Sequence, residues 1–333
     1  MATDRFDQIL LKMLEQLRIS DFHFHSDRPL ACRVNGEVQS FPDIVVSRQE
    51  LDDVLRHHMD TESYQTFEAT GDMDFALVVG ERRFRANAAK ALHGLTLILR
   101  TIVTEIPNIE KLGLPPAIHS ALEHTAGLVL VTGQTGSGKS TSLASMVDKI
   151  NRTRAENIIT VEDPVEFVHQ PQKSIIFQRE VGRDTKSFAA ALKGALRQDP
   201  DIILLGELRD YETVSMALTA AETGHLVFGT LHTSGAPETI TRIIDAYPAE
   251  EQAQARSQLS GSLRVVMTQQ LLKRKGGGRV GAFEIMVNTP AVANLIREDK
   301  VPQITNALQT GAQHGMITME KYVEMLQKQG IID

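Results

Sequence analysis

The sequence contains a single cysteine, Cys32, and its longest apolar stretches, such as 127–132 and 201–205, are only as long as a strand. One cysteine excludes an internal disulfide and any zinc site of the paired Cys-x-x-Cys type. Strand-length runs fall far short of the roughly 18 residues that indicate a membrane span. We therefore expect a protein without zinc, disulfides or membrane-spanning helices.

The sequence also has no signal-peptide pattern and no excess of positive charge. Asp4, Asp7 and Glu15 interrupt the apolar positions of the first seventeen residues, so we expect the protein to remain in the cytoplasm. The chain has 42 acidic and 35 basic residues, a formal net charge of -7. Because nucleic-acid binding draws much of its affinity from Lys and Arg that neutralise phosphates, we expect no nucleic-acid partner.

The chain is long enough for two domains, because single cores usually stop growing near 250 to 300 residues and this sequence has 333. The first part opens with an amphipathic helix, whose apolar positions are Phe6, Ile9, Leu10, Met13, Leu14 and Leu17. From 21 to about 100 the pattern is strand-like, with turn residues at 35–36 and 71–72. Pro and Gly then cluster over 107–116, which indicates an interdomain hinge.

The second part alternates short apolar strands with helical segments. The strands are expected at 128–132, 158–161, 202–205 and 226–230. This alternation indicates a parallel sheet wound on both faces, and ligands on such sheets bind beyond the carboxyl ends of the strands. Near the C-terminus, Thr289 and Pro290 supply an N-cap and a first-turn proline, so a helix is expected to begin there. The glycines at 276–278 separate two apolar runs and indicate a hairpin loop.

The segment 133–140, Gly-Gln-Thr-Gly-Ser-Gly-Lys-Ser, matches the phosphate-binding P-loop pattern in full, and it follows a predicted strand. Glycines let the backbone curl until its N–H groups point at phosphate oxygens, and the following helix adds its positive end. We expect Lys139 to reach the β- and γ-phosphates of ATP and Ser140 to hold Mg²⁺. The predicted nucleotide-binding residues are Gly133, Gln134, Thr135, Gly136, Ser137, Gly138, Lys139, Ser140 and Thr141. The competing interpretation is a Gly-rich turn without a ligand.

Carboxylates for a metal and a water are expected at the ends of neighbouring strands. In the common second P-loop motif an apolar strand ends in Asp, whereas here Gly206 holds that place and Glu207 follows. We predict that Glu207 lies in the Mg²⁺ shell, directly or through a water. Glu166, after the preceding strand, is predicted to orient or deprotonate the attacking water.

Two alternatives remain open for these acids. Glu162 and Asp163 come first in the same acidic segment, and their role can be to fix its loop. The acids can also be purely structural, capping helices or pairing with Arg179 and Arg183.

Two histidines, His225 and His232, bracket the strand at 226–231. His232 is expected at the carboxyl end, near the γ-phosphate, where it could report whether that phosphate is present. The alternative, a hydrogen-bonded structural histidine, stays open.

Together these features predict an α/β fold. A RecA-like P-loop NTPase domain with a doubly wound, mostly parallel sheet and C-terminal helices is expected over 117–333. A small α+β, PAS-like domain is expected over 1–105, with the linker at 106–116.

The run 196–210, Leu-Arg-Gln-Asp-Pro-Asp-Ile-Ile-Leu-Leu-Gly-Glu-Leu-Arg-Asp, resembles the signature of the secretion-superfamily ATPases, which drive type II secretion and type IV pili. The segment 160–166 resembles the acidic box of that family, and 224–233 resembles its histidine box. With the 20–23 opening and the 281–286 strand, the likeness covers nearly the whole chain.

Within that superfamily the chain is most similar to the PilT-like retraction ATPases, because it has neither the zinc insertion nor the long N-terminal extension usual in extension and secretion ATPases. The segment 291–298, Ala-Val-Ala-Asn-Leu-Ile-Arg-Glu, resembles the helix motif AIRNLIRE associated with retraction. Val292 replaces Ile, a mild change, whereas Ala293 replaces Arg. This leaves an accessory retraction motor, or a secretion or pilus-assembly ATPase of the same superfamily, as alternatives.

The resemblance implies an ATP-hydrolysing homohexameric motor that drives type IV pilus retraction and twitching motility, at the inner face of the cytoplasmic membrane. Its implied partners are an inner-membrane platform protein and, in some systems, a paralogous pilus ATPase. ATP would lie at subunit boundaries, with Arg83, Arg85 and Arg100 at the family's positions for arginines that compensate phosphate charge. From composition alone, these three arginines would be interpreted as ordinary charged residues on the surface.

Two functions of a different class share the same sheet, a DNA-processing ATPase and a small-molecule kinase. A kinase needs a lid and an acceptor pocket, and neither is legible in the sequence. A DNA motor needs basic loops, and the only compact basic run, 273–275, is predicted to be a solvated hairpin tip.

Overall fold

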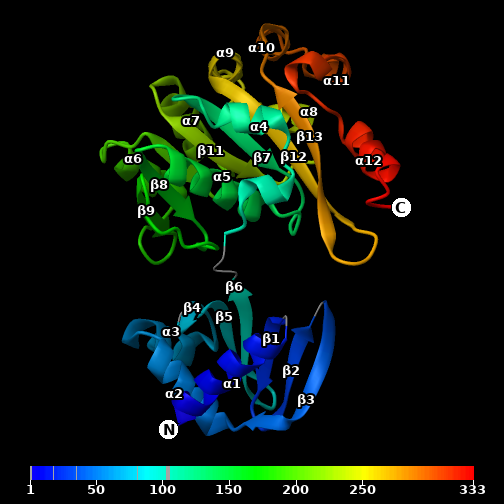
Figure 1. The fold of residues 1–333 in the computed structure, drawn as a ribbon. Helices are drawn as coiled ribbons and strands as arrows, with labels where there is room; N and C mark the ends of the chain where they lie inside the picture. Colours follow the sequence, from blue (N-terminus) through cyan, green and yellow to red (C-terminus); the bar gives the residue numbers. More distant parts are fainter. Residues whose placement is uncertain (1, 18, 35, 81, 103–105) are drawn as a thin grey trace. The chain divides into compact units, whose positions relative to one another are not determined.

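The computed structural model describes residues 2–17, 19–34, 36–80, 82–102 and 106–333. The chain divides into two compact units, Met1–Glu105 and Ile106–Asp333 (Figure 1). Asn35, the first residue of a predicted turn, lies outside the described residues.

The N-terminal unit is an antiparallel sheet with helices packed on one face (Figure 1). In the order β3-β2-β1-β6-β5-β4, its strands are β3 (Glu37–Val46), β2 (Arg28–Val34), β1 (Ile19–His25), β6 (Gly94–Ile102), β5 (Arg82–Ala91) and β4 (Asp72–Val79). The helices are α1 (Ala2–Gln16), α2 (Arg48–His58) and α3 (Thr61–Thr70). The apolar stripe predicted for the first helix is confirmed, because Phe6 and Leu10 are buried against Phe22 and Phe24 of the sheet.

Two helices, α2 and α3, occupy part of the region for which only a strand-like pattern was predicted. A local signal for α2 exists: Ser47 caps it in a capping box with Glu50, whose carboxylate accepts from the Ser47 N–H. Asp60 caps α3 with its side chain alone, which accepts from the Ser63 N–H at 2.8 Å. Gly71 adopts a φ of 80° and ends α3, so the turn predicted at 71–72 is a helix C-cap instead of a hairpin turn.

The C-terminal unit is built on a mixed, mostly parallel sheet. In the order β13-β12-β7-β11-β10-β8-β9, its strands are β13 (Arg279–Val287), β12 (Leu263–Lys273), β7 (Gly127–Thr132), β11 (Leu226–Leu231), β10 (Ile202–Leu205), β8 (Asn157–Glu162) and β9 (Ile175–Glu180). All neighbours pair in parallel except β12 and β13, which form an antiparallel hairpin. The four strands predicted for this part are confirmed as β7, β8, β10 and β11.

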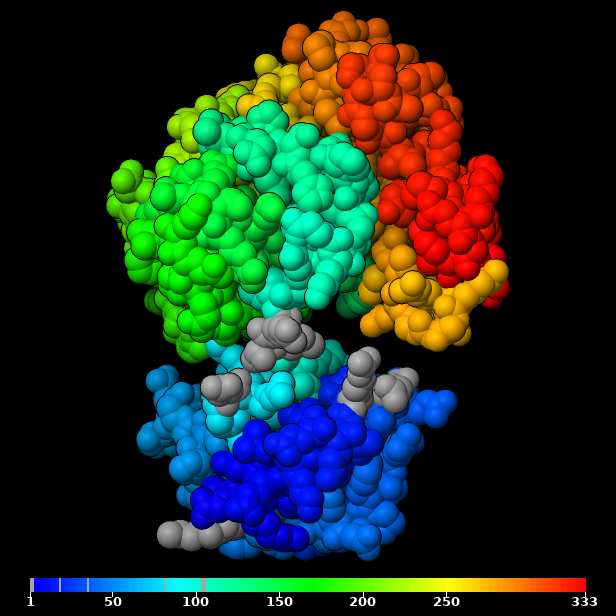
Figure 2. Space-filling model, in the orientation of Figure 1, coloured from blue at the N-terminus to red at the C-terminus, as the bar shows by residue number. Residues whose placement is uncertain are grey.

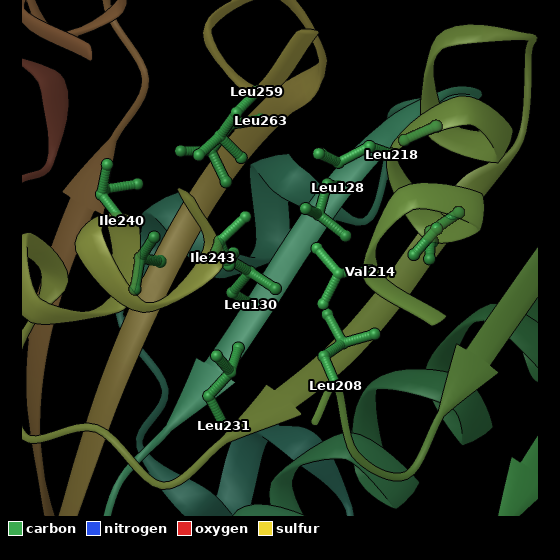
Figure 3. Packing of buried hydrophobic residues seen from close by; sticks show 14 of the residues in the cluster. Leu128, Leu130, Leu208, Val214, Leu218, Leu231, Ile240, Ile243, Leu259 and Leu263 are labelled. Carbon is green, nitrogen blue, oxygen red and sulfur yellow. The ribbon is translucent and has the colours of Figure 1, made fainter. Parts of the chain in front are cut away.

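Helices cover both faces of this sheet (Figure 1). They are α4 (Pro116–Ala121), α5 (Lys139–Thr153), α6 (Phe188–Ala195), α7 (Tyr211–Glu222), α8 (Ala236–Asp245), α9 (Gln252–Ser262), α10 (Pro290–Arg297), α11 (Ile304–Thr310) and α12 (Met319–Lys328), with short 3₁₀ turns at Ile109–Leu112, Val301–Gln303 and Ala312–His314. Alternate residues of β7 serve the two faces. Leu128 and Leu130 pack with α7, α8 and α9 (Figure 3), whereas Val129 and Val131 pack with α4, α5 and α12.

The predicted C-terminal features are confirmed. The Thr289 side chain accepts from the Val292 N–H and caps α10. The loop of the β12–β13 hairpin contains the three glycines 276–278 and lies beside the C-terminal residues (Figure 2), where the Lys275 N–H donates to the Ile331 carbonyl at 2.8 Å. Among the residues that the structure describes, no helix has both the length and the apolar character needed to cross a bilayer.

Candidate functional site

The P-loop connects the carboxyl end of β7 to the first residue of α5. Gly133, Gly136 and Gly138 all adopt positive φ angles, of 139°, 79° and 89°. Residues other than glycine rarely adopt such angles. The loop therefore curls tightly into the helix. An α-helix leaves its first N–H groups without partners inside the helix and carries a partial positive charge there, so this end of α5 is suited to bind phosphate.

The Lys139 ammonium lies over the loop that precedes it. Its Nζ atom donates to the Gly133 carbonyl at 2.7 Å and to the Gln134 carbonyl at 3.1 Å. Burial lowers the pKa of Lys139, while the charges of Glu207 and Glu166 act to raise it. Both predicted acids are thus near enough to Lys139 for their charges to act on it.

The remaining predicted loop residues differ in exposure. Gln134 and Thr135 are exposed, Ser137 is buried, and Ser140 and Thr141 are half-buried in the first turn of α5. Ser140 has the hydroxyl that the sequence assigns to Mg²⁺.

Glu207 follows β10 after Gly206, and packing explains the glycine. The Gly206 N–H donates to the Val161 carbonyl at 2.8 Å, which holds the chain against β8. A Cβ atom at this position would lie 3.2 Å from the Cα atom of Glu162, so a side chain in the place that usually holds Asp would press against the backbone of β8. The acid therefore comes one residue later.

The Glu207 carboxylate contacts two basic side chains, Arg209 and His232. Its Oε1 atom lies 2.6 Å from Nε of Arg209 and 3.4 Å from Nε2 of His232. Burial acts to raise the pKa of Glu207, but the hydrogen bond and charge of Arg209, helped by His232, hold that pKa below its usual value. The side chain is ionised at neutral pH, as a site for a cation requires. Arg209 was not predicted, although it belongs to the signature run.

The acidic segment after β8 is anchored by its neighbour β9. Glu162 accepts from the Thr160 hydroxyl at 2.7 Å and from Nε2 of Gln178 at 3.3 Å. Gln178 also donates to the Phe167 carbonyl at 2.8 Å. Burial raises the pKa of Glu162, while its hydrogen bonds from Thr160, Gln178 and the backbone of Glu166 act to lower that pKa. Glu162 thus fixes the loop, as one of the open alternatives held, and Glu166 remains exposed.

The structural alternative named Arg179 and Arg183 as partners of these acids, and both arginines have other partners. Arg183 pairs with Asp184, its own neighbour in sequence, at 2.8 Å. Arg179 donates to the Asp184 carbonyl at 3.0 Å. Neither is among the ion-pair partners of Glu207.

The two histidines lie at opposite ends of β11. His232 follows the carboxyl end and contacts Glu207, as described above. His225 precedes the amino end, and its Nδ1 atom is 3.0 Å from the Ala220 carbonyl at the end of α7. A strand rises by roughly 3.3 Å per residue, so His225 lies far from the P-loop within this unit. The catalytic role predicted for His225 therefore has no support from its position in this unit, where the ring contacts backbone.

The three predicted arginines belong to the sheet of the N-terminal unit. Arg85 of β5 is paired directly with Arg100 of β6. Arg100 Nε lies 2.9 Å from Oδ1 of Asp21, yet its side chain is 70% exposed. Arg83 lies two residues from Arg85 and shares its face of the strand. This face is opposite the one that carries the helices, because Phe84 between them is buried in the core.

The residues around Lys139 fit a magnesium nucleotide. Mg²⁺ usually binds one or two protein oxygens, keeps several waters and takes its other ligands from substrate phosphates. In the described part of the chain, no group of three or more His, Cys, Asp and Glu side chains could hold a metal by itself. The Ser140 hydroxyl and the ionised Glu207 carboxylate provide the smaller set that such an ion needs.

Comparisons with known proteins show which family the chain resembles. The family described as Type II/IV secretion system protein matches residues 68–276. The chain is 48% identical to the type IV pilus retraction ATPase PilT of Pseudomonas aeruginosa, over 94% of this chain and 91% of that protein. It is 47% identical to a twitching motility protein of Neisseria gonorrhoeae, over 90% and 81%. The crystal structure of the pilus retraction motor PilT with bound ADP superposes with a TM-score of 0.91 at 44% identity and covers 98% of this chain and 94% of that one.

Proposed function

This chain belongs to the type II/IV secretion system protein family and is a type IV pilus retraction ATPase, and we propose that the P-loop, Glu166, Glu207 and His232 form its site of ATP hydrolysis. The observation that carries the proposal is the position of Lys139. Its ammonium bonds to the loop carbonyls and is close enough to both acids for their charges to act on its pKa. No other part of the chain that the structure describes combines these elements.

Each residue has a distinct task in this proposal. The backbone of 133–138 and the first turn of α5 hold the phosphates, and Lys139 leaves the loop carbonyls to contact the β- and γ-phosphates. Mg²⁺, bound by Ser140 and through water by Glu207, would neutralise charge on the phosphate oxygens. Glu166, an exposed carboxylate near Lys139, orients the attacking water and accepts its proton. His232 senses the γ-phosphate through its contact with Glu207.

The motor itself is proposed to be a homohexameric ring with a RecA-like ATPase domain and a PAS-like N-terminal domain in each subunit. Arg83, Arg85 and Arg100 of one subunit would complete the site of a neighbour, where cationic groups stabilise the transferring phosphoryl charge. Their exposed face, opposite the helices, supports this placement. The 106–116 segment would act as the hinge when γ-phosphate contacts are lost.

In the cell, the ring is proposed to work at the inner face of the cytoplasmic membrane on an inner-membrane platform protein, with or without a paralogous pilus ATPase. Ala293, where the retraction motif has Arg, is half-buried in α10. Deleting the gene tests this role. Excess surface pili that cannot retract are expected, whereas cells without pili would indicate assembly, and retraction lost only together with a paralogue would indicate an accessory motor.

ATP turnover of the purified protein tests the site. Lys139→Ala is expected to reduce turnover by at least about 100-fold, since it removes the cation that contacts the phosphates. Lys149→Ala is the matched control, because Lys149 lies on the same helix and pairs with Glu110 at its surface. Equal turnover in both variants would contradict the proposal. Strong stimulation by added DNA would favour a DNA-processing ATPase instead.

A further inference from the structure

A buried glutamine, Gln269, connects strand β12 to the P-loop and to the helix α5 that follows the loop. Its side chain is almost fully buried, with the residue 4% exposed. The Nε2 atom donates to the Ser137 carbonyl at 2.8 Å, and the Oε1 atom accepts from the Ser142 hydroxyl at 2.7 Å. Both ends of the amide are therefore used, one on the loop and one on α5.

The glycines of the loop make this approach possible. A Cβ atom on Gly138 would lie 2.8 Å from Nε2 of Gln269, and a Cβ atom on Gly133 would lie 2.3 Å from the Gln269 carbonyl oxygen. Real Cβ atoms essentially never come so close to another heavy atom. Glycine at 133 and 138 thus lets β12 approach the loop closely, in addition to permitting the positive φ angles.

The bond to Ser137 fixes the direction of a neighbouring N–H group. A trans peptide is planar, so the carbonyl of Ser137 and the N–H of Gly138 point in opposite directions. Because Gln269 holds the carbonyl toward β12, the Gly138 N–H is directed away from β12. The second bond, to Ser142, fixes the distance between the loop and the first turns of α5.

We infer that Gln269 is a positioning residue of the nucleotide site, which sets the orientation of the phosphate-binding backbone before the ligand arrives. The inference rests on the proposed nucleotide site. Gln269 acts through the loop and does not need to contact the nucleotide. Gln269 affects the affinity for the nucleotide. Without it, the loop would have to be ordered when the phosphates bind, and that ordering costs binding free energy.

The variant Gln269→Ala removes both hydrogen bonds, and Gln270→Ala is its matched control because Gln270 is the next residue and is exposed. Without the amide, the Kd for a fluorescent ADP analogue is expected to rise about tenfold, as the loss of one to two hydrogen bonds implies. The KM for ATP should rise by a similar factor while kcat changes less than about threefold, the pattern of lost uniform binding. Gln270→Ala should leave all three values unchanged.

Hydrogen exchange in the nucleotide-free protein gives a second readout. The amides of 133–142 are expected to exchange faster in Gln269→Ala than in the parent protein, while those of the N-terminal sheet stay the same. Two milder variants separate the bonds. Gln269→Glu keeps the volume and the acceptor for Ser142 but loses the donor to Ser137, so it should weaken ADP binding more than Ser142→Ala does.

The outcomes separate this inference from the proposed function. A parent protein that does not bind the ADP analogue would overturn the nucleotide site itself. A parent protein that binds it, with Gln269→Ala binding equally well and exchanging equally slowly, would overturn only the role of Gln269. If Gln269→Ala does not fold, Gln269→Glu and Ser142→Ala decide, and parent-like affinity in Gln269→Glu overturns the role.

Discussion

The Nε2 atom of His232 lies 3.4 Å from the Oε1 atom of Glu207. These residues follow the ends of β11 and β10, which pair in parallel with Leu205 opposite Gly229. The contact joins the acid assigned to the metal shell with the histidine assigned to sensing the γ-phosphate. We expect His232→Gln to lower ATP turnover by at least about tenfold, because it replaces the imidazole that contacts Glu207 with an amide that does not act as an acid or base.

His225→Gln is the matched control for that variant, since His225 lies at the other end of the same strand and bonds to backbone. Its turnover should stay within about twofold of the parent protein, as expected outside a site. A loss of the same size in both variants would mean that the histidines act through the stability of β11, which thermal unfolding would reveal.

Replacing the proposed base isolates the chemical step. Glu166→Gln keeps the size of the side chain but loses the negative charge, so hydrolysis should fall by about 100-fold or more while ADP affinity changes little. Asp163→Asn, an exposed acid of the same loop, serves as the control. Steady-state turnover and ADP binding are the measurements, and unchanged turnover in Glu166→Gln would remove the role assigned to that acid.

The glycine at the end of β10 should be needed for packing. In Gly206→Ala the new Cβ atom would lie 3.2 Å from the Cα atom of Glu162 and 3.3 Å from the Val161 carbonyl oxygen. Both neighbours are backbone of a central strand, so a loss of about 1–2 kcal/mol in the free energy of unfolding is expected.

Gly261→Ala is expected to change the free energy of unfolding in the opposite direction. Gly261 lies in α9, and a Cβ atom there would meet nothing within 4 Å. Alanine is favoured over glycine in helices, so a gain of up to about 1 kcal/mol is expected. Urea unfolding of both variants compares them, and equal effects would show that space around Gly206 is not the cause.

The buried His169 predicts a pH dependence of stability. This residue follows the acidic segment, and burial lowers its pKa to about 4 from 6.5, although Asp148 of α5 acts to raise it. The unfolded chain therefore binds a proton at a higher pH than the folded chain does. The contribution of His169 to the free energy of unfolding is fully present above pH 6.5. It decreases as the pH falls toward 4, by up to roughly 3 kcal/mol.

His169→Gln removes the titrating group, so its unfolding free energy should depend less on pH between 6.5 and 4 than that of the parent protein. Urea unfolding at several pH values measures this. Parallel curves for the two proteins over that interval would show that His169 does not titrate as the structure indicates.

The proposed arrangement of the arginines can be tested by mixing subunits. Arg85→Ala and Lys139→Ala should each hydrolyse ATP slowly as pure rings. An arginine supplied in trans contributes a factor of about 10³ or more to kcat in known cases. In mixed rings, an intact Arg85 from one subunit can meet an intact Lys139 of its neighbour. Turnover should therefore recover in part on mixing, and the absence of any recovery would argue against a site shared between subunits.

Short windows of sequence were sufficient for several features. The P-loop, the four central strands and the cap at Thr289 were all predicted correctly, because each depends on residues close together in the chain. The capping box at Ser47 is equally local, and it marks the beginning of α2 in the sequence. The weakly amphipathic α3 gives little apolar periodicity, so its caps were the only clear sign of it.

The tertiary structure alone decided which side chains support the site. Ser137 and Gln269 are separated by 132 residues, and they meet only because β12 pairs with β7. The separation of the two histidines likewise follows from the direction of β11 within the sheet. Backbone preferences act between neighbours along the chain and can be read locally. Contacts between strands depend on register and order in the sheet, which the packing of the whole unit determines.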